Sequence, residues 1–256
     1  MGCAIHYMAP QIGQAAVGLL NRMGLNVVIP EGQGCCGLMA HGMGDEGRAR
    51  RMALDTIAAF EDLGVEEIVV PCASCAAHLQ QGYPSLLEVG TAGQREAARG
   101  FGARVRDLSE FLVRNGLPHL MGGRAGNRAE TPVTYHDPCH LAHGLGIRKE
   151  PRELLRALNA WSFREMDGAD RCCGMGGSFR LSHAGISRRI LREKVQAIEK
   201  SGASAVATGC MGCWIHLQEG VHRAGLGVEV LHLAEVLWNE LRGTGDKAVL
   251  AQRSAL

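Results

Sequence analysis

The sequence is poor in aromatic residues, in net charge and in long apolar runs. Phe, Trp and Tyr make up 4% of its 256 residues, so a core would consist mainly of Leu, Val, Ile, Ala and Met. Lys and Arg number 27 against 26 Asp and Glu, a balance that argues against nucleic-acid binding and against a polybasic membrane anchor. No stretch approaches the roughly 20 apolar residues that cross a bilayer.

The first residues, MGCAIHYMAP, also lack the charged and apolar regions of a secretory signal. We therefore expect a cytoplasmic protein without a membrane span, which partner proteins could hold at the inner face of the membrane. Hydrophobic residues at 46% and charged residues at 21% are typical of a folded globular chain.

Cysteine, in contrast, is abundant, with ten residues in the chain. Thiols in a reducing compartment are kept reduced, so structural disulfides are not expected there. Metal ligation or thiol redox chemistry is the better interpretation of so many cysteines.

The cysteines form a repeat. In the first half 31 residues separate a single Cys from a Cys-Cys pair, and 35 separate the pair from a Cys-x-x-Cys; the matching gaps in the second half are 32 and 36. The flanking segments RRMALDTIAAFEDLG and RRILREKVQAIEKSG also correspond, as do ARVRDLSEFLV and VEVLHLAEVLW. The pattern indicates duplication and fusion. The two series are Cys3, Cys35, Cys36, Cys72, Cys75 and Cys139, Cys172, Cys173, Cys210, Cys213.

Hydrophobic periodicity predicts alternating helices and strands in each half. The predicted helices cover residues 11–23, 46–63, 151–158 and 186–201, and the predicted strands cover 27–29, 66–70, 132–136 and 203–207. Such alternation predicts an α/β fold of two tandem, homologous, Rossmann-like domains with parallel sheets, related by pseudo-two-fold symmetry. Ligands gather beyond the carboxyl ends of parallel strands, and we expect each cysteine group to follow a strand.

We predict a first cysteine-rich domain at residues 1–118, a second at 131–242, and a loosely ordered tail at 243–256. A Gly-, Arg- and Asn-rich linker is expected over 115–130, and the first copy carries about a dozen extra residues near 83–100. The second copy has a strand before Cys139, whereas only two residues precede Cys3, so the first copy is expected to lack its opening strand or to come from a shortened chain.

The spacing favours iron–sulfur clusters over zinc. Clusters are usually held by four cysteine thiolates, and each copy offers five. A tetrahedral zinc site takes four ligands and leaves one cysteine over, so a structural zinc protein is the alternative. A thioredoxin-like use of Cys-x-x-Cys would leave six cysteines unexplained. Two adjacent cysteines can face one centre only if the backbone turns sharply, and Gly37 and Gly174 can supply a positive φ.

Several histidines lie near the cysteines. His78 and His216 each follow a Cys-x-x-Cys by three residues and are interpreted first as core or capping residues, with hydrogen bonding to cluster sulfur as the alternative. His136, His140 and His143 lie around Cys139 and are weaker candidates for proton delivery.

Through the pattern Cys, Cys-Cys-Gly, Cys-x-x-Cys, present twice over nearly the whole chain, the sequence resembles the cysteine-rich CCG domain family. Its members include the cysteine-rich subunit of heterodisulfide reductase, the iron–sulfur subunit of glycolate oxidase, lactate-utilisation proteins and a subunit of anaerobic glycerol-3-phosphate dehydrogenase. The resemblance implies two α/β domains with clusters at the carboxyl edges of their strands. In the heterodisulfide reductase branch a complete five-cysteine set holds a non-cubane 4Fe–4S cluster, and both sets are complete here, which implies two clusters.

The stretches GCAIHYMAPQIGQAAVGLLNRMGLNVVIPEGQGCCG and YHDPCHLAHGLGIRKEP look closer to the glycolate oxidase subunit. The ferredoxin-like Cys-x-x-Cys-x-x-Cys runs usual in that subunit do not occur in this sequence. The first hypothesis is an electron-transfer subunit of a flavin-dependent glycolate- or lactate-type oxidoreductase, with a flavoprotein dehydrogenase subunit, a ferredoxin-type iron–sulfur protein, or both, as partners. The second is catalytic cleavage of a disulfide substrate at the clusters.

Overall fold

A computed structural model describes residues 2–121 and 131–243, and its strands form two parallel sheets. In the first half β1 (Ile68–Val70) pairs with β2 (Val105–Asp107). In the second half the sheet has the order β4-β3-β5-β6, from β3 (Pro132–Tyr135), β4 (Ser162–Phe163), β5 (Ala205–Thr208) and β6 (Glu229–His232). The predicted α/β class with parallel sheets is therefore confirmed.

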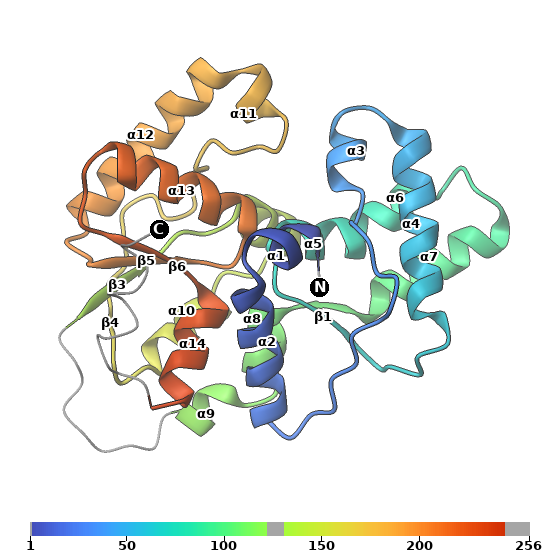
Figure 1. The fold of residues 1–256 in the computed structure, drawn as a ribbon, viewed down its shortest axis with the longest axis horizontal. Helices are drawn as coiled ribbons and strands as arrows, with labels where there is room; N and C mark the ends of the chain where they lie inside the picture. Colours follow the sequence, from blue (N-terminus) through green and yellow to red (C-terminus); the bar gives the residue numbers. More distant parts are fainter. Residues whose placement is uncertain (1, 122–130, 244–256) are drawn as a thin grey trace.

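Helices connect these strands in both halves (Figure 1). In the first half they are α1 (Cys3–Met8), α2 (Pro10–Arg22), α3 (Leu38–Gly42), α4 (Glu46–Glu61), α5 (Ala73–Ala77), the π-helical η1 (His78–Gly82), α6 (Tyr83–Leu86), α7 (Ala92–Arg104), α8 (Leu108–Arg114) and α9 (Leu117–Met121). In the second half they are the π-helical η2 (His140–Leu145), α10 (Glu150–Arg156), α11 (Phe179–Ser182), α12 (Ala184–Lys200), α13 (Met211–Arg223) and α14 (Leu233–Leu241).

The strand registers follow the sequence repeat. Ile68 on β1 lies opposite Val105 on β2, and Val206 on β5 lies opposite Val230 on β6. When the two halves are aligned on Cys72 and Cys210, Ile68 is equivalent to Val206. The strand pairs β1–β2 and β5–β6 therefore have the same register. The predicted correspondence between ARVRDLSEFLV, which spans β2 and α8, and VEVLHLAEVLW, which spans β6 and α14, is therefore confirmed.

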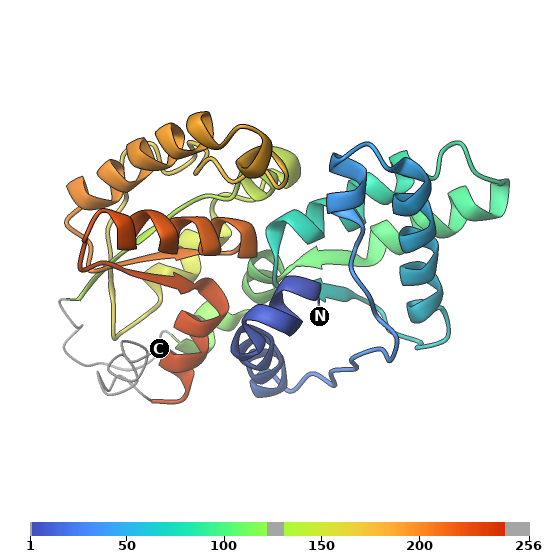
Figure 2. The same ribbon diagram turned by 45° about the horizontal axis from the view of Figure 1, so that its top comes forward.

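The hydrophobic core runs across the boundary between the halves. In the second half α12 and α13 cover one face of the sheet, while α10 and α14 lie on the other (Figures 1 and 2). Helix α14 packs on α2 of the first half, and α8 of the first half packs on α10. One buried cluster accordingly contains Leu19 of α2, Leu112 of α8 and Leu237 of α14. Because α14 packs on the first half and its counterpart α8 packs on the second, the pseudo-two-fold relation stays a prediction, as do the domain limits 1–118 and 131–242.

One predicted strand is wrong. The segment Val27–Ile29 has no regular secondary structure. Its counterpart in the second half, β4, pairs only with β3, and among the described residues the first half has no strand equivalent to β3. Without that partner the segment has no backbone groups to pair with, and Val28 and Ile29 stay 47% and 50% exposed.

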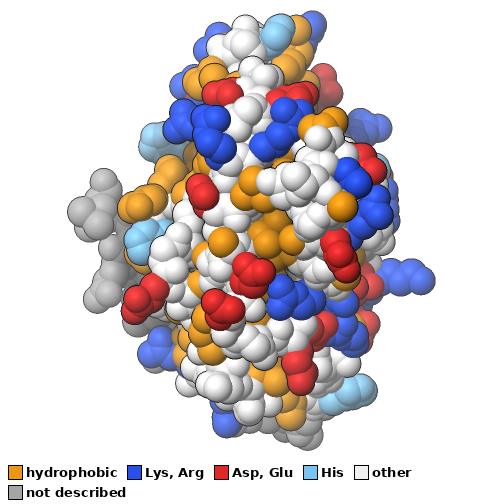
Figure 3. Space-filling model, turned by 90° about the vertical axis from the view of Figure 1, so that its right-hand side faces the viewer, with side chains coloured by type: hydrophobic (Ala, Val, Ile, Leu, Met, Phe, Trp, Pro, Cys, Tyr) orange, Lys and Arg blue, Asp and Glu red, His pale blue; other side chains and the backbone are white. Residues whose placement is uncertain are grey.

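A groove of about 530 Å³ lies where this partner would be. Its walls are the irregular segment 25–30 on one side and the outer edge of β1 on the other. No described strand pairs with that edge of β1. The face of the first half that points away from the second carries interspersed basic and acidic side chains, with hydrophobic side chains showing between them (Figure 3).

The remaining predictions fall close to the observed elements. The helices predicted at 11–23, 46–63, 151–158 and 186–201 are α2, α4, α10 and α12, within a few residues. The extra residues near 83–100 form α6 and most of α7, where the second half has the single helix α13. The expected linker begins with the short helix α9 rather than with coil, and the rest of it, with nearly all of the predicted tail, lies outside the described residues.

Candidate metal centre

The structure brings all ten cysteines together. Each thiol is close enough to the next to shift its pKa, so that the sulfurs form one continuous line through both halves. For example, Cys36 Sγ lies 3.7 Å from Cys75 Sγ. The order along the line is Cys3, Cys35, Cys36, Cys75, Cys72, Cys210, Cys213, Cys173, Cys172 and Cys139.

The two five-cysteine sets meet where the Cys-x-x-Cys segments of the two halves touch. Cys72 and Cys210 each precede a helix, α5 and α13, with extended backbone conformations. The backbone N–H of Ala73 donates to the carbonyl of Gly209 at 2.9 Å, which fixes the two segments side by side. The contact between Cys72 and Cys210 is therefore built into the fold.

Most of the cysteine groups follow a strand as expected. Cys72, Cys139 and Cys210 come after β1, β3 and β5, and the pair at 172–173 follows β4 through a loop. Cys3 lies on α1, and the sequence predicted no strand before it. The prediction is wrong for the pair at 35–36, since the strand predicted before that pair does not form. There the irregular segment 25–34 carries the chain to the site.

The two Cys-Cys pairs depend on the glycine that follows each of them. Gly37 has φ +81° and Gly174 has φ +90°, as expected for residues that turn adjacent cysteines toward one site. A Cβ on Gly174 would lie 2.6 Å from the carbonyl oxygen of Ser187. Only glycine therefore satisfies both the backbone conformation and the space at this position.

The first cysteine of each pair has a strongly lowered pKa. Hydrogen bonds from the thiols of Cys3 and Cys36 lower the pKa of Cys35 to about 2. Hydrogen bonds from Cys139 and Cys173 lower the pKa of Cys172 to about 2 as well, and the backbone N–H of Gly174 donates to its sulfur at 3.2 Å. Neighbouring sulfurs cannot all ionise without a cation between them, which is the electrostatic requirement that a bound metal meets.

A hydroxyl group distinguishes the two sets. Ser74 Oγ of the first half lies 3.1 Å from Cys210 Sγ of the second half and 2.8 Å from His140 Nδ1. The position equivalent to Ser74 in the second half is Gly212, which has no side chain to offer. The serine could have been suspected from its place inside Cys-x-x-Cys, but its contact with the other half could not.

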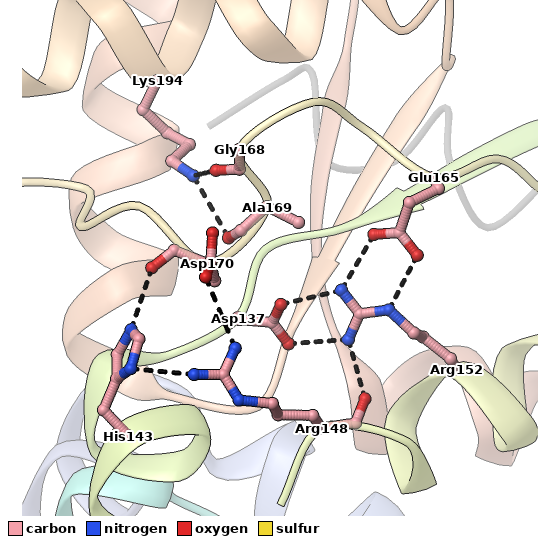
Figure 4. A network of polar contacts seen from close by, with 9 residues as sticks. All are labelled: Asp137, His143, Arg148, Arg152, Glu165, Gly168, Ala169, Asp170 and Lys194. Atoms are coloured by element: carbon pink, nitrogen blue, oxygen red, sulfur yellow. Dashed lines mark hydrogen bonds and ion pairs between the residues drawn. The ribbon is translucent and has the colours of Figure 1, made fainter.

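A buried lysine lies beside the second set. Lys194 Nζ donates to the carbonyls of Gly168 at 2.6 Å and Ala169 at 3.2 Å, and burial lowers its pKa. Figure 4 shows this ammonium group reaching down from α12. The sequence carried a signal for this buried lysine, because Lys194 lies on the apolar side of α12, whose other buried residues include Leu191 and Ile198. Its counterpart in the first half is Thr56.

The histidines near the cysteines differ in burial and in the groups that they contact. His136 is fully buried, and one ring nitrogen forms a group with Cys173 Sγ and Cys213 Sγ in which all three atoms lie within 4.8 Å of one another. Burial lowers the pKa of His136 to about 3 and the pKa of His78 to about 4, so both are neutral near pH 7. His216 Nε2 lies 3.2 Å from Ser187 Oγ, and His143 Nε2 lies 3.3 Å from the carbonyl oxygen of Asp170 at the surface.

An ion-pair network supports the segment between β3 and Cys139. Arg152 donates two hydrogen bonds to Asp137, of 2.9 and 2.7 Å, and two to Glu165, of 2.7 and 2.8 Å (Figure 4). The Asp137 side chain is only 2% exposed. Because Asp137 lies between His136 and Cys139 in the sequence, the network holds the backbone that carries both.

Every helix within residues 2–121 and 131–243 is too short or too polar to span a bilayer.

The protein-family model "Cysteine-rich domain" (CCG) matches residues 1–80 and 133–218. Over 236 residues the chain is 33% identical to "Lactate utilization protein A" of Bacillus subtilis, with 92% of this chain and 95% of that protein covered. Bacillus pumilus has a protein of the same name that is 33% identical over 235 residues.

A further relative from Bacillus subtilis is the "Probable glycolate oxidase iron-sulfur subunit", 33% identical over 250 residues. The match covers 96% of this chain but about half, 54%, of that protein. With both copies of the five-cysteine module inside the matched regions, the chain belongs to the cysteine-rich CCG domain family.

Proposed function

We propose that the chain is the iron–sulfur electron-transfer subunit of a flavin-dependent 2-hydroxyacid oxidoreductase of the glycolate or lactate type. The observation that carries the proposal is the unbroken line of ten cysteine sulfurs through both halves. The names of two relatives, a lactate-utilisation protein and an iron–sulfur subunit, support the substrate class.

The donor set fits iron–sulfur clusters better than isolated metal ions. Cys3, Cys35, Cys36, Cys72 and Cys75 would hold one cluster, and Cys139, Cys172, Cys173, Cys210 and Cys213 the other. Iron–sulfur clusters use thiolate ligands, and half of these cysteines are buried. A closed zinc site uses four donors in a tetrahedron, which leaves the continuity of the line unexplained. When bound, such clusters supply one-electron transfer.

The contact between Cys72 and Cys210 supports a relay. It brings the two sets together at one point, so an electron would cross between the halves over a short distance. The chain's own residues would bind and insulate the clusters, and the oxidation of the 2-hydroxyacid itself would take place on a partner. We propose a flavoprotein dehydrogenase subunit, a ferredoxin-type protein, or both, as partners.

The test is to measure iron, zinc and acid-labile sulfide in the anaerobically purified chain, followed by electron paramagnetic resonance with and without an added thiol. Near-stoichiometric iron and sulfide, with signals that do not respond to the thiol, are the expected result. A new signal that appears on adding the thiol would instead favour cleavage of a disulfide substrate at non-cubane clusters. Zinc without sulfide would contradict both.

A further inference from the structure

We propose that His136 is a nitrogen donor to the group bound by the second cysteine set, alongside the thiolates of that set. The proposal rests on the proposed function, because the group to which the nitrogen binds is taken to be an iron–sulfur cluster. Nothing in the cysteine spacing requires a histidine at this place. The position and environment of this one side chain carry the argument.

His136 is fixed by the sheet. It directly follows β3, and its backbone N–H donates to the carbonyl of Ala207 on β5 at 2.9 Å. Its side chain is 0% exposed. From this position a ring nitrogen lies within 4.8 Å of the sulfurs of both Cys173 and Cys213, which are themselves buried. Three donor atoms at such mutual distances can be ligands of one bound group.

The ring has no adequate partner among the described residues. Neither Nδ1 nor Nε2 of His136 has a hydrogen bond of normal geometry, although the carbonyl of Ala169 is close enough to act on the ring. A buried polar group without a hydrogen-bond partner is destabilising, so such a group calls for a partner. His216, another fully buried histidine of this half close to the cysteines, contacts Ser187 Oγ at 3.2 Å.

A neutral imidazole carries one N–H and one lone pair. A metal-bound histidine commonly donates its second N–H to a backbone carbonyl, which orients the ring. The carbonyl of Ala169 is the acceptor near the His136 ring, and it also accepts from the backbone N–H of Asp137 and from Lys194 Nζ. The arrangement therefore supplies a nitrogen ligand atom beside the sulfurs of Cys173 and Cys213.

The first half has no equivalent donor. Within residues 2–121 no histidine nitrogen forms such a group with two cysteine sulfurs. The buried ammonium of Lys194 likewise belongs to the second half, where Thr56 is its counterpart in the first. Where such a neutral nitrogen takes the place of one of the five thiolates at the metal, it raises the reduction potential of the iron–sulfur centre. The second centre is therefore expected to hold the electron in preference to the first.

The first experiment uses the unaltered chain, purified anaerobically and reduced, at natural abundance and with all histidines labelled with nitrogen-15. Pulsed electron paramagnetic resonance should show a strongly coupled nitrogen that changes isotope with the label. A reduced protein with full iron and sulfide but without such a coupling would overturn the proposal and leave the proposed function standing. Absence of iron and sulfide would overturn both.

Variants then identify the histidine that supplies the coupled nitrogen. The coupling should be lost in His136→Ala and retained in His216→Ala, the matched buried histidine. Because His136→Ala could fail to fold, two double variants, one in each cysteine set, test independently which set carries the nitrogen coupling. Cys172→Ser with Cys173→Ser should abolish the coupling, and Cys35→Ser with Cys36→Ser should keep it. A coupling that follows the first set, or that survives in folded His136→Ala, would contradict the assignment.

Discussion

Ser74 of the first half places its hydroxyl 3.1 Å from the sulfur of Cys210 in the second half. This is a polar contact between the two cysteine sets. Gly212, the residue equivalent to Ser74 in the second half, has no side chain with which to make the corresponding contact to the first set.

A hydrogen bond to a ligand sulfur raises the reduction potential of an iron–sulfur centre. We therefore expect Ser74→Ala to lower the potential of the second centre by on the order of tens of millivolts, given that about 59 mV corresponds to a tenfold change for one electron. Ser74→Thr, which keeps a hydroxyl, should restore most of the potential. Redox titration followed by electron paramagnetic resonance measures the shift, with exposed Ser85→Ala as the control. Equal potentials in all variants would contradict the prediction.

Gly174→Ala should disable the second centre. The residue has φ +90°, and an added Cβ would lie 2.6 Å from the carbonyl oxygen of Ser187. We expect a loss of stability of about 1–3 kcal/mol from strained backbone alone, and a fall in bound iron toward half. Denaturant unfolding and iron analysis check this. Gly185→Ala is the matched control, because a Cβ there meets nothing within 4 Å and alanine favours the helix. Full iron content in Gly174→Ala would refute the prediction.

Arg152→Ala should destabilise the protein strongly. It removes both hydrogen bonds to Asp137, whose side chain is 2% exposed, and leaves a buried carboxylate without its cation. Breaking a buried ion pair in this way costs about 3–5 kcal/mol. The control is Arg99→Ala, which breaks an exposed pair with Glu88 and should cost less than about 1 kcal/mol. Anaerobic unfolding in urea compares them, and similar losses in the two variants would show that the network is not structural.

His232 should make stability depend on pH. Burial lowers its pKa to about 4, and its Nδ1 accepts the N–H of Ala234 at the start of α14. The unfolded state binds a proton at this residue near pH 6.5 and the folded state only near pH 4, so stability falls as pH drops through that window. The total contribution is about 3 kcal/mol.

His232→Asn keeps an acceptor at this position but does not titrate. We expect the free energy of unfolding of this variant to fall less between pH 7 and pH 4 than that of the unaltered chain, by about 3 kcal/mol at most. His222→Asn, at an exposed position, should leave the pH profile unchanged. If His232→Asn keeps the same slope as the unaltered chain, another group is responsible.

The repeat could be predicted from the sequence because its signals are local. The cysteine gaps of the two halves differ by one residue each, helical periodicity and the glycines after each Cys-Cys pair lie within short windows, and Gly37 and Gly174 have the positive φ that the turn requires. The strand expected at Val27–Ile29 failed for a different reason. Its β-branched residues favour a strand, but a strand also needs a neighbour with which to pair, and β-propensity does not report the neighbour.

The contacts between the halves could not be predicted from the sequence. Ser74 meets Cys210 across 136 positions, and such a distant pair leaves no periodic trace in one sequence. Lys194 was open to recognition as a charged residue on an apolar helix face, but its acceptors, the carbonyls of Gly168 and Ala169, come from a loop without a motif. His136 stood out only as one of three histidines around Cys139, and burial is what separates it from the other two.

No strand within residues 2–121 and 131–243 pairs with the outer edge of β1, which affects how the chain behaves in solution. An unpaired strand edge is a template for other extended chains, and natural sheets often protect such edges with charge, proline or a covering loop. Here the groove beside the edge is bordered by the partly exposed Leu25, Val28 and Ile29. We therefore expect this edge to favour self-association at high concentration, and Val28→Lys to raise the solubility without disturbing the cysteines.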